Sequence, residues 1–403
     1  MPHNLIRIVQ PDRETVGPPG SSPALVSMAI FAWNEESGIT STLESLFQQS
    51  VFTKLAEQKI RCEVFCVLNG CEDGTARVAT EFFAAWKKSS PLADYVHCGV
   101  ADIREKGKLN AWNEYVHKIS SRAAKTLFMM DADILIHLPN TLWNMFQTLE
   151  QDKAANISID RPCKDIVFKA KKNLREQISV AMSGLTAAAP AQLCGQLYCI
   201  RAETARKIYL PKDLSACEDG FIKALVCTDS LTQPVQANRI RLAPEAEHTF
   251  EAYTSPGAIL KNQKRQIMGQ TMVHLLIDGE LKQLPLAERE NLAAQLKNRE
   301  IADPQWLKKL IAAHMKRTKY FWKLYPGLLG QRFKAFENLS PAKRVLSFPA
   351  AFAGAVAATP AAFLAWRALK SGSTNYWPRA QRLGLKPLDV NAPKELSTNK
   401  STA

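Results

Sequence analysis

The sequence predicts an α/β fold with a mostly parallel sheet and helices on both faces, because strand-length apolar stretches alternate with helix-like stretches in its first half. The apolar stretches are Ala24 to Ala32, Cys62 to Leu68 and Thr126 to Met130. Helical patterns over Ile39 to Phe47 and over residues 75–88 separate them. Such alternation is typical of parallel strands joined by helical crossovers.

A short strand at Tyr95 to Gly99 and a helix over residues 108–119 complete this pattern. The last strand then ends in Asp131-Ala132-Asp133. The ends of such strands form the crevice where open α/β sheets bind ligands. Hard cations such as Mg²⁺ prefer oxygen ligands and substrate phosphates, so the two carboxylates predict a metal ion and a phosphorylated substrate.

A series of short motifs resembles family 2 glycosyltransferases of the hexosyltransferase type, whose catalytic domain has the Rossmann-like GT-A fold. The resemblance spans roughly residues 24–275, and individually weak motifs gain weight from their common order. The motifs are Phe31 to Glu35, Asn69 to Thr75, Gly107 to Asn113, Asp131 with Asp133, Gly195 to Tyr198, Cys217 to Phe221 and Lys264 to Gln266.

This resemblance implies an inverting transferase that uses a nucleotide-sugar, with UDP as the expected nucleotide. Asp133 is the expected direct ligand of Mg²⁺ or Mn²⁺, and Asp131 either joins it or orients the ribose. Asp219 is the expected catalytic base, and Glu218 positions it or the acceptor. Arg265 is expected to stabilise the departing diphosphate. The other residues expected to bind the nucleotide are Phe31, Trp33, Glu35, Asn69 and Lys108.

Each of these residues also has a structural interpretation. Glu218 and Asp219 are equally typical of the first turn of a solvated helix, and Arg265 of a solvated helix face. Phe31 and Trp33 are ordinarily core or turn aromatics. Cys217 is expected to fill a small space rather than act as a nucleophile.

Two other functions compete with sugar transfer. A sugar nucleotidyltransferase needs a glycine-rich phosphate loop, and none follows the first predicted strand. A catalytically inactive membrane scaffold would need no acidic cluster, and clustered carboxylates cost stability when they bind nothing. Because the late basic motif has Gln266-Ile267 in place of the Trp of Gln-x-x-Arg-Trp, we expect addition of one sugar rather than processive synthesis.

The region after the catalytic domain, which we place at 24–277, predicts contact with a membrane. Residues 278–345 are expected to form amphipathic helices, in which aromatic and basic residues mix as they do at membrane interfaces. Within a hydrophobic segment at 346–370, residues 348–366 carry no charge. This length is compatible with a membrane span, a re-entrant or interfacial helix, or a buried helix.

The composition narrows the partners and the compartment. A net charge of +14 suits an anionic surface, and the chain shows no nucleic-acid-binding module. Nine cysteines without a C-x-x-C pair favour a reducing cytoplasm. Residues 1–23 and 371–403 are expected to be disordered tails, the first without a signal peptide. We therefore expect a peripheral or single-pass enzyme on the cytoplasmic side of the inner membrane, acting on a glycan or lipid-linked acceptor in polysaccharide or cell-envelope synthesis.

Overall fold

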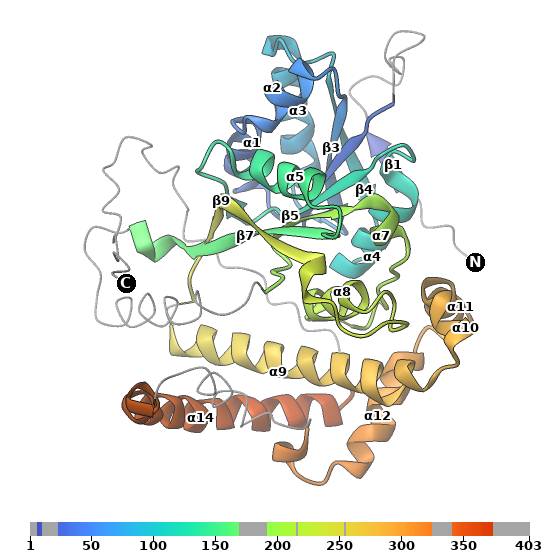
Figure 1. The fold of residues 1–403 in the computed structure, drawn as a ribbon, viewed down its shortest axis with the longest axis vertical. Coiled ribbons are helices and arrows are strands. Elements are labelled where there is room, and N and C mark those ends of the chain that lie inside the picture. Colours follow the sequence, from blue (N-terminus) through green and yellow to red (C-terminus); the bar gives the residue numbers. More distant parts are fainter. Residues whose placement is uncertain are drawn as a thin grey trace.

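A nine-stranded sheet forms the centre of the protein (Figure 1). The computed structural model describes residues 6–9, 23–168, 192–214, 217–253, 255–324 and 341–373. The strand order is β1-β4-β3-β2-β5-β8-β7-β9-β6. The strands are β1 (Ile6–Val9), β2 (Val26–Ala32), β3 (Cys62–Asn69), β4 (Val96–Ile103), β5 (Thr126–Asp131), β6 (Ile134–Leu135), β7 (Ile157–Lys164), β8 (Leu197–Arg201) and β9 (Ile240–Phe250).

The first half of the sheet confirms the α/β prediction. Strands β4, β3, β2 and β5 are parallel neighbours. All seven residues of β2 are buried, as expected for a central strand covered on both faces. Successive side chains point to opposite faces, so Met28 and Ile30 join one core cluster while Ala29 and Phe31 join the other.

The prediction of a mostly parallel sheet is wrong for the second half, where the sheet is mixed. Strand β8 is antiparallel to both β5 and β7, and β6 is antiparallel to β9. Only β7 and β9 form a parallel pair there. The reason is topological, since antiparallel neighbours do not require the helical crossover that joins the strands of the first half.

Helices cover both faces of the sheet (Figure 1). One face carries α1 (Ile39–Phe47), α2 (Val51–Glu57), α3 (Thr75–Ser89) and α5 (Thr141–Gln151). The other face carries α4 (Lys108–Glu114), α7 (Ala202–Arg206), α8 (Glu218–Cys227) and α9 (Pro256–Gly279). The predicted helix over 108–119 continues from α4 into a π-helical turn, η1 (Tyr115–Ile119).

The prediction of a disordered tail over residues 1–23 is wrong at Ile6–Val9, which forms β1. This strand pairs antiparallel with β4, with Ile6 opposite Ile103. It thereby covers hydrogen-bonding groups that an edge strand would otherwise expose. The third predicted strand is also longer than expected, since β4 extends to Ile103. Residues 1–5, 10–22 and 374–403 of the predicted tails lie outside the described residues.

The described residues after α9 are mostly helical. The described helices of this part are η4 (Leu281–Gln283), α10 (Leu286–Glu290), α11 (Leu292–Ala302), α12 (Trp306–Arg317), η5 (Phe321–Lys323) and α14 (Pro341–Lys370). Helix α14 packs against α9 and α12, below the sheet in Figure 1. Within the described ranges, no helix combines the length and the apolar character that crossing a membrane requires.

A buried histidine–carboxylate pair ties β7 to β9. His248 Nδ1 lies 2.7 Å from Asp160 Oδ2, and neither side chain is exposed. Burial alone would lower the pKa of His248, but the facing Asp160 carboxylate raises it to about 10. A pKa raised by folding means that the pair stabilises the protein fully below the pKa of an exposed histidine, about 6.5. This contribution is lost as the pH rises through about 10.

We therefore expect His248→Leu to lower the free energy of unfolding at pH 7 by about 3–5 kcal/mol, because it leaves Asp160 buried and uncompensated. Urea unfolding followed by circular dichroism measures this loss. The double variant Asp160→Leu/His248→Leu should regain most of it. A single variant as stable as the wild type would show that the pair is not charged.

Candidate active site

The predicted motifs of the first half converge at the carboxyl ends of β2, β3 and β5. The loops after β2 and β3 are joined by hydrogen bonds into one unit. The backbone N–H of Glu72 donates to Asn34 Oδ1 at 2.8 Å, and that of Glu35 donates to Thr75 Oγ1 at 2.8 Å. The backbone N–H of Gly74 donates to Glu36 Oε2 at 3.0 Å. Glu35 thus contributes its backbone to a braced loop at the edge where a nucleotide is expected.

Two glycines shape the neighbouring loop that leads to α4. Gly70 has φ 65°, and a Cβ there would meet Lys106 Cγ at 2.4 Å. Gly107 has φ 133°, a backbone conformation that other residues rarely adopt. Its N–H donates to Asn69 Oδ1. Asn69 was expected to contact the nucleotide. In the structure its side-chain oxygen accepts this hydrogen bond and so positions the turn before Lys108.

The two aromatic residues of the first motif have different environments. Phe31 is 6% exposed and packs edge-to-face against Tyr115, with ring centroids 6.1 Å apart. The prediction that Phe31 flanks a nucleobase is therefore wrong, because its ring belongs to the core. Trp33 is half-buried, and its Nε1 is shielded from solvent without a hydrogen-bond partner among the described residues. A donor in this state favours a ligand acceptor, since buried polar groups are normally paired.

Lys108 joins the predicted metal motif to the predicted catalytic motif. Its Nζ lies 2.6 Å from Asp131 Oδ1 and 3.0 Å from Glu218 Oε1. It also donates to the backbone oxygen of Gly195 at 3.0 Å. All three charged side chains are nearly buried, with 10–13% of each exposed. Lys108 was expected to bind the nucleotide, and in the structure it instead bridges two acidic residues that are 87 positions apart in sequence.

The charges in this cluster are mutually dependent. Burial opposes the positive charge of Lys108, but Asp131 and Glu218 raise its pKa far above the ordinary value. Burial would likewise raise the pKa of Glu218, and Lys108 holds it below the ordinary value. Burial raises the pKa of Asp131 to about 7, against the opposing effect of Lys108. Each acid therefore depends on the lysine for its charge.

Asp133 differs from Asp131 in having an unused oxygen. Its Oδ1 is shielded from solvent and has no hydrogen-bond partner in the described part of the chain. A buried carboxylate oxygen without a partner is costly unless a cation binds it, so Asp133 fits a divalent metal. Among the described residues, no three acidic, histidine or cysteine side chains lie close enough together to hold a metal ion. Diphosphate oxygens and water would complete the coordination, as is usual for Mg²⁺.

The Glu218-Asp219 motif lies at the N-terminus of α8. Glu218 is 7% exposed, so the alternative of a solvated first turn is wrong for this residue. Asp219 is half-buried, and burial, followed by the charge of Glu218, raises its pKa to about 6. A carboxylate with a raised pKa accepts a proton more readily near neutral pH, which suits a general base.

Arg265 comes from α9, which packs against α8. Its Nη2 donates to Asn262 Oδ1 at 3.3 Å, and the side chain is partly buried. Its charge lowers the pKa of both Glu218 and Asp219. Arg265 therefore belongs to the electrostatic environment of the acidic pair, and its contact with the departing diphosphate stays a prediction. Cys217 packs beside this pair in a left-handed conformation, with φ 62°.

Sequence reasoning missed the segment around Gly195 and Gln196 as part of the site. The backbone N–H of Asp131 donates to the backbone oxygen of Gln196 at 2.8 Å. A Cβ at Gly195 would lie 2.8 Å from Glu218 Oε1, so only glycine leaves room for this acid. The Gln196 side chain also reaches His248, with Oε1 3.4 Å from Nε2. The sequence analysis included Gly195 to Tyr198 among the family motifs but gave these residues no role in the site. Residues 169–191, which come before this segment, lie outside the described ones.

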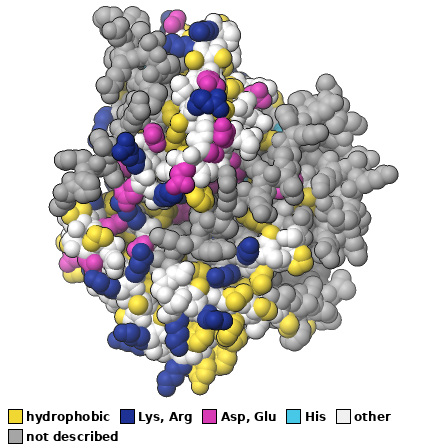
Figure 2. All heavy atoms as spheres, turned by 180° about the vertical axis from the view of Figure 1, so that it is seen from behind, with side chains coloured by type: hydrophobic (Ala, Val, Ile, Leu, Met, Phe, Trp, Pro, Cys, Tyr) yellow, Lys and Arg dark blue, Asp and Glu magenta, His cyan; other side chains and the backbone are white. Residues whose placement is uncertain are grey.

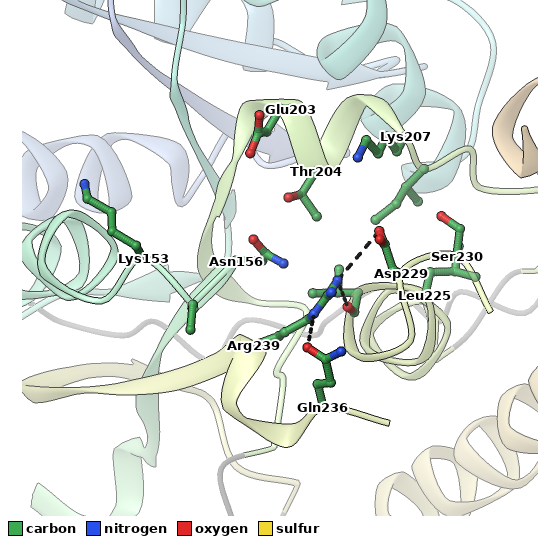
Figure 3. A pocket seen from close by; sticks show the side chains of 13 residues that line it. Lys153, Asn156, Glu203, Thr204, Lys207, Leu225, Asp229, Ser230, Gln236 and Arg239 are labelled. Carbon is green, nitrogen blue, oxygen red and sulfur yellow. Dashed lines mark hydrogen bonds and ion pairs between the residues drawn. The ribbon is translucent and has the colours of Figure 1, made fainter. Parts of the chain in front are cut away.

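A cavity of about 290 Å³ lies at the opposite end of α8 (Figure 3). Arg239 fills part of it, donating to Gln236 Oε1 at 3.0 Å and to the Val226 oxygen at 3.2 Å. Arg239 also lies 3.6 Å from Asp229. None of the residues predicted for catalysis lines this cavity, which is separate from the acidic cluster.

The comparison with protein families agrees with the motifs and the fold. The model of glycosyl transferase family 2 matches residues 27–195, which include most of β2, all of β3 to β7, and Lys108, Asp131 and Asp133. Residues 27–195 are thus similar to the domain of the family 2 glycosyltransferases, the family whose motifs the sequence resembles. No curated protein sequence matches this chain.

Several solved structures are similar to this chain. A mannosyltransferase from Pyrobaculum calidifontis, in complex with GDP-Man and Mn²⁺, is 17% identical with a TM-score of 0.48, covering 87% of this chain and 90% of that chain. S. aureus TarS is 13% identical with a TM-score of 0.39, and the match covers 86% of this chain and 90% of TarS. Glucosyl-3-phosphoglycerate synthase from Mycobacterium tuberculosis, with Mn²⁺ and UDP, is 15% identical with a TM-score of 0.37, covering 58% and 73%.

We expect Lys108→Met to lower the free energy of unfolding by about 3–5 kcal/mol, because it leaves Asp131 and Glu218 buried without their shared cation. Denaturant unfolding at pH 7 measures the change. Lys106→Met is the matched control, because the Lys106 side chain is 58% exposed and its ion pair with Glu72 lies at the surface. Such an exposed pair contributes little to stability. Equal losses in the two variants would contradict the bridging role of Lys108.

Proposed function

We propose that this enzyme transfers one sugar, with inversion, from a UDP-sugar to a hydroxyl group of a glycan or lipid-linked acceptor in a Mg²⁺- or Mn²⁺-dependent reaction. The observation that supports it most is the arrangement of the four acids. Lys108 compensates Asp131 and Glu218, whereas Asp133 keeps an unused oxygen and Asp219 keeps a raised pKa. One acid is thus suited to a metal ion and another to a proton.

The donor binds, in this proposal, across the carboxyl ends of β2, β3 and β5. Trp33 Nε1 donates a hydrogen bond to the nucleotide, and the braced backbone around Glu35 supports it. Asp133 holds the divalent ion, with Asp131 oriented beside it by Lys108 and by its bond to the Gln196 oxygen. When bound, the ion supplies a positive charge that neutralises the diphosphate leaving group.

The acceptor is activated, in this proposal, by Asp219 from the N-terminus of α8. Its carboxylate takes the proton of the attacking hydroxyl group on the side of the sugar opposite the diphosphate, which gives inversion. Glu218 holds a fixed position through Lys108 and orients its neighbour or the acceptor. Arg265 contributes a guanidinium that matches phosphate oxygens and stabilises the departing diphosphate.

The proposed place of action is the cytoplasmic side of the inner membrane, in the synthesis of a polysaccharide, glycolipid or cell-envelope glycan. The basic and aromatic C-terminal region supports this location. A sugar nucleotidyltransferase is less well supported, because the family match is to glycosyl transferases. An inactive scaffold is also less well supported, because it gives no reason for the partnerless oxygen of Asp133.

The test is UDP release from a panel of UDP-sugars by the purified protein, with and without Mn²⁺ and with a glycolipid extract as acceptor. We expect metal-dependent release from one donor. Asp219→Asn should lower the rate about 10²–10⁴-fold, because it removes the general base. Asp94→Asn, at an exposed acid away from the cluster, is the matched control and should keep the wild-type rate. An Asp219→Asn rate equal to that of the wild type would contradict the assignment of the base.

A further inference from the structure

Apolar and aromatic side chains are exposed together on η5 and α14. Tyr320 and Trp322 are 49% and 50% exposed, and their rings stack with centroids 4.7 Å apart. On α14, Phe348, Val356 and Phe363 are 53%, 55% and 43% exposed. The two elements adjoin, since Phe321 and Phe363 have ring centroids 6.0 Å apart. We call these five exposed residues the outer apolar face.

The outer apolar face of α14 lies away from the side that packs on the protein. At about 100° per residue, Phe348, Val356 and Phe363 fall within an arc of roughly 80°. A different arc of the same helix is buried against the core, and its residues are Ala358, Ala361, Ala362, Ala365 and Leu369. Small residues there let α14 approach α9 closely. The helix therefore buries one side against the protein and exposes apolar side chains on another.

The surroundings of the outer apolar face are strongly basic. Residues 304–324 contain six lysines and arginines, residues 341–373 contain four, and neither range contains an aspartate or glutamate. The space-filling view shows hydrophobic and basic side chains close together in the lower part of the molecule (Figure 2), where α9, α12 and α14 lie in Figure 1. Exposed cations include Lys316, Arg317, Lys319, Lys323, Arg344, Arg367 and Lys370. Lys309 is also exposed, but it pairs with Asp303.

We propose that this face docks the enzyme flat on an anionic lipid bilayer, with α14 lying along the interface. The aromatic and apolar side chains would enter the headgroup region, while the cations bind lipid phosphates. Each cation near an anionic bilayer is attracted to it, and neither range contains an acid that would oppose this attraction. This proposal rests on the proposed function, because a lipid-linked acceptor would then be held on the same surface as the enzyme.

Sedimentation of the full-length protein with vesicles tests the docking without any donor or acceptor. We expect binding to vesicles of phosphatidylcholine with phosphatidylglycerol to be at least tenfold stronger than to pure phosphatidylcholine, and to weaken with salt. Two double variants should each weaken binding to the anionic vesicles at least tenfold, namely Tyr320→Ser/Trp322→Ser and Lys319→Glu/Lys323→Glu. Val235→Ser is the matched control, because Val235 is 75% exposed and lies outside the face. Unfolding midpoints identify any variant whose loss reflects misfolding.

Equal binding to neutral and anionic vesicles would overturn the proposal, and so would wild-type binding by both double variants. Displacement from the vesicles by duplex DNA, with stronger binding to that DNA, would assign the surface to nucleic acid and overturn it too. The Asp219→Asn variant should bind vesicles like the wild type. No UDP release by the wild-type protein, with intact vesicle binding, would count against the proposed function alone. UDP release by the wild-type protein without vesicle binding would count against the docking alone.

Discussion

The buried ion-pair network of Lys108 is the interaction on which the rest of the site depends. One ammonium group contacts the end of β5 through Asp131, the start of α8 through Glu218 and the segment before β8 through Gly195. Removing a partner from such a network is costly, because a buried charge then stays uncompensated. The lysine therefore fixes the distance between the metal motif and the catalytic motif as well as balancing their charge.

The fold brings the partners of this network together from both halves of a mixed sheet. The parallel half places Asp131 beside the loops after β2 and β3, and the antiparallel half returns β8 to the neighbouring position. Gly195 lets the backbone approach Glu218 closely, and Gly107 provides the positive φ of the turn before Lys108. Helix α9 then adds Arg265 from outside the sheet. The contacts of Lys108 that stabilise the fold are thus the same contacts that position the acids of the proposed active site.

The sequence predicted the parts of this structure that local patterns encode. Apolar strands such as Val26–Ala32 and the acidic motif after β5 follow from residue spacing, and their positions are as expected. The mixed parallel and antiparallel pairing of β8, β7, β9 and β6 was not predicted, because strand pairing over long sequence separations leaves no periodic signal. The same limit explains Phe31, whose ring was placed with the nucleotide although its packing against Tyr115 puts it in the core. The role of Lys108 also depended on a contact with Glu218 that only the fold creates.

Lys108 compensates Asp131 and Glu218, whereas Asp133 keeps an oxygen without a partner among the described residues. In this account, Asp133 therefore couples the binding of the metal ion to the binding of the nucleotide. Calorimetric titration of UDP, with and without Mn²⁺, tests this coupling most directly in the wild type and in Asp133→Asn. The account predicts that Mn²⁺ strengthens UDP binding to the wild type at least tenfold and leaves binding to the variant unchanged. Asparagine should fold normally there, because Asp133 Oδ1 has no hydrogen-bond partner to lose among the described residues. Equal strengthening of UDP binding by Mn²⁺ in both proteins would contradict the account.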